Sequence, residues 1–119
     1  MRISTIATAA VLALGFAAPA LADASMVGKW SWEGFTIECK EGGANGMSCI
    51  VADGPKNKGM EMIKSKLEKK GNDFVGQVAH PASGETYNAK MNMSDADTWN
   101  MDGCTAANVC AKGTFKRVK

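Results

Sequence analysis

Hydrophobic and polar residues alternate most regularly from Tyr87 to Met93, where every second residue is apolar and the residues between are asparagine or lysine. Because alternate side chains of a strand point to opposite faces, this pattern predicts a strand with one face in a core. The preceding turn, His80 to Glu85, contains a proline that fixes φ and a glycine that can take a positive φ. Residues 74–93 therefore predict a β-hairpin.

The segment from Phe35 to Ala52 shows the same alternation on both sides of a glycine-rich turn. In one register of this second predicted hairpin, Cys39 lies opposite Cys49. The same register places Ile37 opposite Val51, so the apolar faces of both strands agree with it. A slip of one residue would break both agreements at once, because it turns every side chain to the other face.

Three further segments have a strand-like pattern: Val27 to Glu33, Thr98 to Gly103 and Ala111 to Val118. Met60 to Lys70 fits both a helical and a strand period, and its content of Glu, Met, Lys and Leu predicts a short helix. Short antiparallel strands separated by turn residues are typical of barrels, in which closure removes exposed edges. We therefore expect an all-β fold, a small antiparallel meander barrel of about seven or eight short strands with one short helix.

The first 22 residues have the pattern of a secretory signal peptide. Arg2 supplies the positive charge, Ile6 to Leu21 is mostly apolar, and the sequence Ala-Leu-Ala precedes Asp23. The apolar run of 16 residues is shorter than the roughly 20 needed to span a membrane. We expect a signal peptide over residues 1–22, a single domain over residues 23–119, no membrane span, and a periplasmic or secreted location.

The four cysteines form two close pairs in the sequence, Cys39 with Cys49 and Cys104 with Cys110. Three pairings are possible. The local one is favoured because each pair can face across a hairpin at the Cβ separation of about 4 Å that a disulfide needs. A four-cysteine zinc site is the alternative, but the chain lacks CxxC spacing. Two disulfides would agree with an oxidising compartment.

Residues that could carry catalysis are few. His80 is the one histidine, no serine lies in a nucleophile-elbow context, and bridged cysteines cannot act as nucleophiles. We expect no enzymatic activity and no cofactor. The net charge is +2, and the basic cluster near residues 64–70 has no interleaved aromatics, so it predicts a solvated face and no nucleic-acid partner.

Methionine is unusually frequent, with eight in 119 residues. Thioethers can bind Cu(I), and exposed Met60 and Met62 together with His80 would favour a copper site. Most of the methionines, however, share strand faces with other apolar residues, as adaptable core residues do. Core packing is therefore the favoured interpretation, and no metal site is predicted.

The C-terminal half, about residues 59 to 118, resembles a family of secreted bacterial proteins, domain-of-unknown-function family 2147. The matching residues are Gly76, Pro81, Gly84, Tyr87, Ala89, Lys90, Met91, Gly103, Cys104, Cys110, Arg117 and Val118. The family looks lipocalin-like. That resemblance implies structural roles for Gly28, Trp30 and Arg117, with the Arg117 cation over the face of the Trp30 ring.

The resemblance and the export signal together predict a small non-enzymatic binding protein of lipocalin-like type, with a small apolar ligand or a protein as partner. A barrel of this size has room only for its own side chains or one small ligand. We therefore expect binding at the barrel mouth or a surface loop, with these candidate contacts: Trp30, Trp32, Tyr87 and Trp99. Ser83, Gly84 and Tyr87 also match a Ser-Gly-x-x-Tyr loop of periplasmic lysozyme inhibitors, which makes an inhibitor-like protein the alternative.

Overall fold

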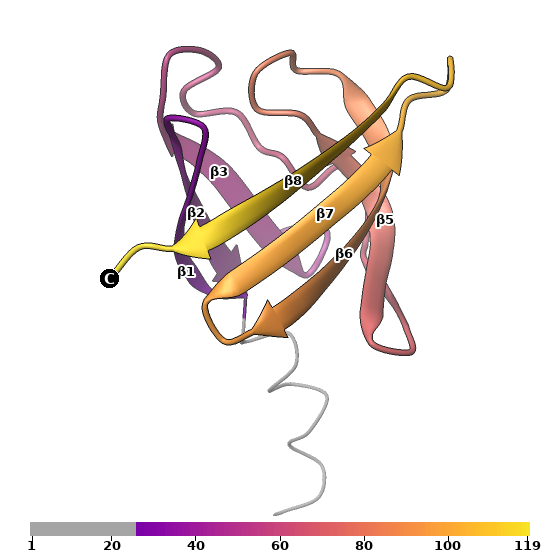
Figure 1. Cartoon of the computed structure of the whole chain (residues 1–119), viewed down its shortest axis with the longest axis horizontal. Helices are drawn as coiled ribbons and strands as arrows, with labels where there is room; N and C mark the ends of the chain where they lie inside the picture. The colour runs from indigo at the N-terminus through magenta and orange to yellow at the C-terminus, as the bar shows by residue number, and fades with distance from the viewer. Residues whose placement is uncertain (1–25) are drawn as a thin grey trace, which may run out of the picture.

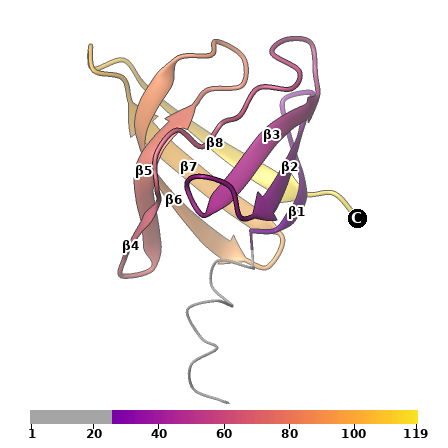
Figure 2. The ribbon, with the colours of Figure 1, turned by 180° about the vertical axis from the view of Figure 1, so that it is seen from behind.

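The computed structural model describes residues 26–119, so the predicted signal peptide lies outside the described residues. They form one antiparallel sheet that curls into a small barrel (Figures 1 and 2). Its strands are β1 (Gly28–Trp32), β2 (Phe35–Glu41), β3 (Met47–Asp53), β4 (Glu68–Lys70), β5 (Asp73–Ala79), β6 (Thr86–Asp95), β7 (Thr98–Cys104) and β8 (Cys110–Arg117). Their order in the sheet is β3-β2-β1-β8-β7-β6-β5-β4. The all-β prediction is confirmed, and residues 26–119 include no helix that could cross a membrane.

The barrel is closed between β3 and β5 by the irregular segment 59–64 (Figure 2). On one side the Met62 N–H donates to the Cys49 carbonyl at 2.8 Å, and on the other the Ala79 N–H donates to the Met62 carbonyl at 2.7 Å. Single bridges pair Ile50 with Glu61 and Ile63 with Val78. Residues 59–64 therefore fill the gap between β3 and β5 and continue the hydrogen bonding of the barrel wall across it.

The helix predicted for Met60 to Lys70 is therefore wrong. This stretch is extended and ends in β4. Helical propensity differs by only a few tenths of a kcal/mol per residue, and a helix this short is marginal by itself. Backbone hydrogen bonds to two strands, together with full burial of Met62 and Ile63, outweigh that local preference.

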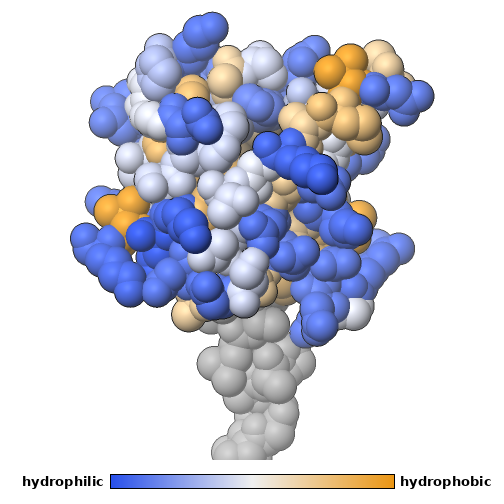
Figure 3. All heavy atoms as spheres, in the orientation of Figure 1, coloured by the Kyte–Doolittle hydropathy of each residue, from blue (hydrophilic) through white to orange (hydrophobic). Residues whose placement is uncertain are grey.

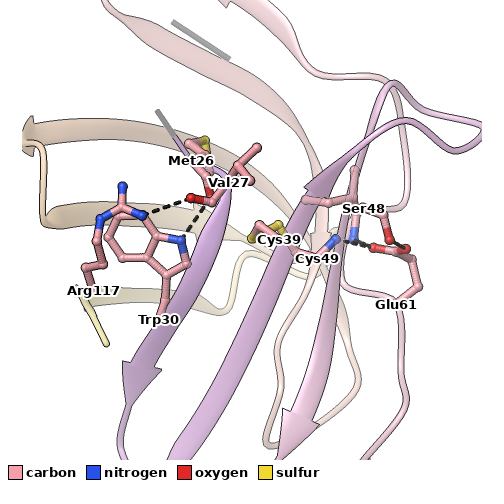
Figure 4. Close-up of a disulfide and its surroundings, with 9 residues drawn as sticks. Met26, Val27, Trp30, Cys39, Ser48, Cys49, Glu61 and Arg117 are labelled. Atoms are coloured by element: carbon pink, nitrogen blue, oxygen red, sulfur yellow. Dashed lines mark hydrogen bonds between the residues drawn. A yellow bond between two sulfur atoms is a disulfide. The ribbon is translucent and has the colours of Figure 1, made fainter. Parts of the chain in front are cut away.

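Glu61 holds the closing segment against β3 (Figure 4). Its carboxylate accepts hydrogen bonds from the Cys49 N–H at 2.8 Å, the Ile63 N–H at 3.0 Å and the Ser48 hydroxyl. Hydrogen bonds to an ionised acceptor are roughly twice as strong as neutral ones. One side chain thus joins the segment to the adjacent strand where the segment has no regular ladder.

The interior of the barrel is filled by side chains. Trp99 stacks on Phe115, with 4.4 Å between the ring centroids. Trp30 and Trp99 pack edge to face, with 5.8 Å between their centroids. Trp30 and Trp99 have no exposed surface. Other buried members of the core are Ile37, Val51, Met62, Ile63, Val78 and Met91. Methionines thus do serve as core residues, as adaptable side chains are expected to.

Arg117, at the end of β8, ties three parts of the chain together. Its guanidinium carbon lies 4.4 Å from the centroid of the Trp30 ring, and one N–H group donates to the Val27 carbonyl at 2.9 Å (Figure 4). Another N–H group donates to the Ala96 carbonyl, also at 2.9 Å. A Cβ at Gly28 would lie 2.6 Å from the guanidinium, so a glycine is needed there. The contact implied by the lipocalin-like resemblance is present.

Asp97 extends this cluster and makes it sensitive to acid. The Lys119 ammonium, 2.9 Å from its carboxylate, lowers the pKa of Asp97 below the ordinary value of 3.8, and Arg117 at 3.2 Å adds to the shift. Because the folded pKa is lower than the unfolded one, the stability it contributes is present above pH 3.8 and is lost as the pH falls through the folded pKa.

Acid titration of thermal unfolding checks this expectation. Below about pH 3.8, the Tm difference between the unaltered protein and Asp97→Asn should shrink toward zero, while at neutral pH the variant should melt lower. Asp102→Asn, at an exposed position without an ion pair among residues 26–119, should leave Tm unchanged throughout. A difference for Asp97→Asn that is independent of pH would contradict a carboxylate-based contact.

Both predicted disulfides are present. Cys39 and Cys49 face each other across β2 and β3, and Cys104 and Cys110 across β7 and β8. The first pair has the predicted register, with Ile37 opposite Val51. Two disulfides indicate an oxidising environment for the folded protein.

Candidate functional site at the barrel mouth

A row of aromatic rings runs from the core to one open end of the barrel. Trp32 stacks on the core residue Phe115 at 5.6 Å. The ring of His80 meets Trp32 edge-on at 5.2 Å, and the Tyr87 ring lies 5.6 Å beyond His80. Whereas Phe115 is buried, the other three side chains are half-buried, so the row emerges into solvent at the barrel mouth.

These rings line a small apolar depression that we call the cup. The residues that line it include Trp32, His80, Tyr87, Met101, Ala111, Lys112 and Gly113. The cavity volume is about 30 Å³, far below the 300–1,000 Å³ of usual small-molecule sites. The cup can therefore receive one small group of a ligand, such as a methyl or the edge of a ring, but not a lipid chain.

Two glycines make the close packing around the cup possible. A Cβ at Gly113 would lie 2.9 Å from the indole nitrogen of Trp32, so the glycine lets this ring lie against β8. A Cβ at Gly103 would lie 2.5 Å from the backbone oxygen of Asn88, so the glycine lets β7 approach β6. Any other residue at either position would displace a wall of the cup.

His80 is oriented by the turn that carries it. Its Nδ1 accepts a hydrogen bond from the Ala82 N–H at 3.1 Å, which leaves Nε2 as the protonated nitrogen of a neutral ring. The turn is closed by the His80 N–H to the Glu85 carbonyl and by the Gly84 N–H to the His80 carbonyl, each at 2.8 Å. Gly84 has a φ of 77°, which allows the chain to reverse direction in this turn. The turn thus holds the His80 ring against Trp32.

The aromatic residues predicted to contact a ligand fall into two groups. Trp30 and Trp99 lie wholly in the core, where they have no surface to offer. Trp32 and Tyr87 lie in the cup, with His80 between them. Met101, Ala111 and Gly113 are not among the predicted contacts, although three other residues of the lining belong to the resemblance: Pro81, Ala89 and Gly103.

The Ser-Gly-x-x-Tyr loop is the tip of the β5–β6 hairpin. Ser83 and Gly84 are exposed, and the Ser83 hydroxyl accepts a hydrogen bond from the Glu85 N–H at 3.2 Å. Tyr87, by contrast, turns its ring toward His80 in the cup. The loop and the cup are therefore neighbours that share one tyrosine.

Methionines and acidic residues give no clear metal site. Met62 is fully buried and Met60 only half-buried, so the exposed methionine pair that would favour copper is not formed. Across residues 26–119, no three side chains among His, Cys, Asp and Glu lie close enough to hold a metal ion together.

A family model, described as uncharacterized protein conserved in bacteria (DUF2147), matches residues 51–117, more than half of the chain. The matched region includes all the cup residues except Trp32. No curated protein and no solved structure matches the chain. The cup therefore has to be interpreted from its own geometry.

Proposed function

The chain belongs to the DUF2147 family of uncharacterised bacterial proteins, and from the geometry of this member we propose that it is a non-enzymatic binding module acting in the periplasm or outside the cell. Its binding site is the cup at the barrel mouth. The ligand class is a molecule that presents one small apolar or aromatic group, with the rest of the molecule remaining in solvent.

The observation that carries this proposal is the contrast between a filled interior and an apolar mouth. Large side chains occupy the barrel, so there is no calyx of the 300–1,000 Å³ usual for small-molecule pockets. At the mouth, the rings of Trp32 and Tyr87 are half-buried, so part of their flat apolar surface is exposed to solvent. Such rings are the side chains that most often anchor a partner or ligand.

The chemistry of the polar residues favours binding over catalysis. His80 has one nitrogen engaged by the Ala82 N–H and faces two rings. All four cysteines are bridged, so no thiolate nucleophile is present. A general base needs an activated group within hydrogen-bond reach, and the side chains of the cup lining that could transfer a proton are His80, Tyr87 and Lys112. None of them contacts a nucleophilic serine or cysteine in that lining.

Tryptophan fluorescence tests the proposal, since Trp32 is half-buried whereas Trp30 and Trp99 are not exposed. We expect benzyl alcohol to change the emission saturably, with a dissociation constant on the order of 1 mM, about −4 kcal/mol for so small a ligand. Trp32→Phe should abolish the signal. A linear, unsaturable response, or none, would contradict binding at the cup.

Filling the cup should block binding. Gly113→Val places a side chain where Trp32 now lies, and we expect the affinity for benzyl alcohol to fall at least about tenfold, 1.4 kcal/mol. Thr114→Val is the matched control, because its side chain is exposed on the outer face of the same strand. Equal losses in both variants, measured by isothermal titration, would show that the effect does not come from the cup.

Inhibition of a lysozyme is the second candidate function, favoured by the exposure of Ser83 and Gly84 at the hairpin tip. If it is correct, the purified protein slows peptidoglycan lysis, and Ser83→Ala combined with Tyr87→Ala abolishes the effect. Full lysozyme activity at excess protein, tested over several lysozyme classes, would rule it out.

A further inference from the structure

Strand β8 has an open edge over much of its length. It pairs with β7 from Cys110 to Lys116, but β1 pairs with it only at Trp30–Arg117 and Ser31–Lys116. Beyond these pairs β1 and β8 diverge, and the tip of the β1–β2 hairpin stands away from the start of β8 (Figure 1). Within residues 26–119, the segment 110–114 thus has a strand on one side only.

The groups on this edge can be identified from the disulfide. Cys104 and Cys110 are opposite each other with their Cα atoms 3.9 Å apart, the close spacing of a non-hydrogen-bonded pair. Such pairs alternate with bonded ones, so Lys112 and Thr114 also point their N–H and C=O groups away from β7. They present two donors and two acceptors to the open side.

An open groove lies along this edge. Ser31, Glu33 and Thr36 form one wall and Lys112, Thr114 and Lys116 the other. The groove and the cup share three residues: Trp32, Lys112 and Gly113. A chain lying in the groove would therefore lie beside the mouth of the cup.

An added strand would have two distinct faces. Because side chains directly opposite one another lie on the same face of a sheet, a residue facing Gly113 would point into the cup, which Gly113 lines. Its neighbours on either side would point outward beside Lys112 and Thr114. Lys112 is exposed and forms no ion pair within residues 26–119. The Lys116 ammonium, by contrast, donates to the Thr98 hydroxyl at 3.2 Å.

We propose that the β8 edge binds an extended segment of another polypeptide by strand addition, with an apolar side chain in the cup and an acidic side chain beside Lys112. Main-chain hydrogen bonds would give affinity and the cup would give specificity. Val109, directly before β8, is 57% exposed. Apolar surface gathers at the upper right of Figure 3, where Figure 1 draws the loop between β7 and β8.

Charge favours an acidic partner over a second copy of this chain. Two β8 edges paired with each other would bring the lysines of both copies together, and like charges on facing strands are destabilising. Edge lysines are a common protection against pairing of this kind. A peptide with glutamates at the outward positions would gain the opposite interaction.

Hydrogen exchange of the full mature protein with a capped peptide, Thr-Val-Glu-Phe-Glu-Val-Thr, tests the inference. Its phenylalanine would face Gly113 and its glutamates would face Lys112 and Thr114. We expect these two amides to exchange rapidly in the free protein and about tenfold more slowly with saturating peptide, because each then donates a main-chain hydrogen bond to the peptide. N-methylation of both glutamates should abolish this protection, and lysines in place of the glutamates should weaken binding.

Four results would overturn the inference. Slow exchange of Lys112 and Thr114 at every protein concentration would mean that the edge is already paired within the chain. Protection that grows with protein concentration would identify a second copy as the occupant. Equal binding of the N-methylated peptide would exclude strand addition, and equal binding of the lysine peptide would exclude the acidic preference. Benzyl alcohol binding at the cup does not require the edge, so the proposed function is judged separately.

Discussion

Trp30→Ala is expected to lower the free energy of unfolding by about 3 to 5 kcal/mol, the usual cost of truncating a buried tryptophan. Trp30 has no exposed surface, and its ring is covered by Trp99 on one side and by the Arg117 guanidinium. Its Nε1–H also donates to the Met26 carbonyl at 2.9 Å. The alanine variant would leave a cavity, an unpaired carbonyl and a cation without its ring.

Urea unfolding measures this loss, and two further variants separate its causes. Trp30→Phe keeps an aromatic face for Arg117 but removes the hydrogen bond, so it should lose less, about 1 to 2 kcal/mol. Val109→Ala, at a position 57% exposed, should change stability by no more than about 0.5 kcal/mol. A loss below about 1 kcal/mol in Trp30→Ala would contradict a filled barrel organised around this ring.

Glu61→Ala is expected to destabilise the protein by about 2 to 4 kcal/mol, because it leaves the N–H groups of Cys49 and Ile63 and the Ser48 hydroxyl without their acceptor. The damage should be local at first. Since this carboxylate holds the closing segment, the amides of Val51 and Met62, which bond across the closure, should lose protection from hydrogen exchange before the amides of β7.

Glu61→Gln and Glu68→Ala are the matched variants. The glutamine keeps one side-chain acceptor and should lose less than the alanine. Glu68 is an exposed glutamate of the adjacent β4, so removing it should change stability by no more than about 0.5 kcal/mol. If Glu61→Ala and Glu68→Ala behave alike, the segment 59–64 does not depend on Glu61 for its position.

The parts of the fold that the sequence predicts correctly are those encoded by short-range pattern. The β5–β6 hairpin follows from the alternation after Tyr87 and the proline and glycine in its turn. The β2–β3 register follows from two constraints that agree, the cysteine pair and the apolar face. Each feature needs only residues within one hairpin, where the period and the turn are sufficient.

The closing segment could not be predicted in this way. Its hydrogen bonds join Met62 to Cys49 on one strand and to Ala79 on another, and no local pattern specifies two partners at once. The isolated preference of residues 60–70 is helical, and tertiary pairing overrides it. In the sequence, nothing distinguishes Glu61 from the other charged residues near it, although its carboxylate binds the closing segment to β3.

The candidate site was predictable in part. Trp30 and Trp32 have the same parity in β1, so the pattern places both on the inner face without showing that one is at the centre and the other at the mouth. Met101 and Gly113 join the cup because β7 and β8 meet the β5–β6 turn there. That meeting depends on how the barrel curls, which alternation alone does not give.

The central claim is that ligands bind at the mouth of a filled barrel, and the methionine methyl groups test it directly. Met101 lines the cup, whereas Met62 and Met91 are fully buried in the interior. In a titration of methyl-labelled protein with benzyl alcohol, followed by NMR, we expect the Met101 signal to shift saturably while Met62 and Met91 stay in place. A saturable shift of Met62 or Met91, or no shift of Met101, would contradict the claim.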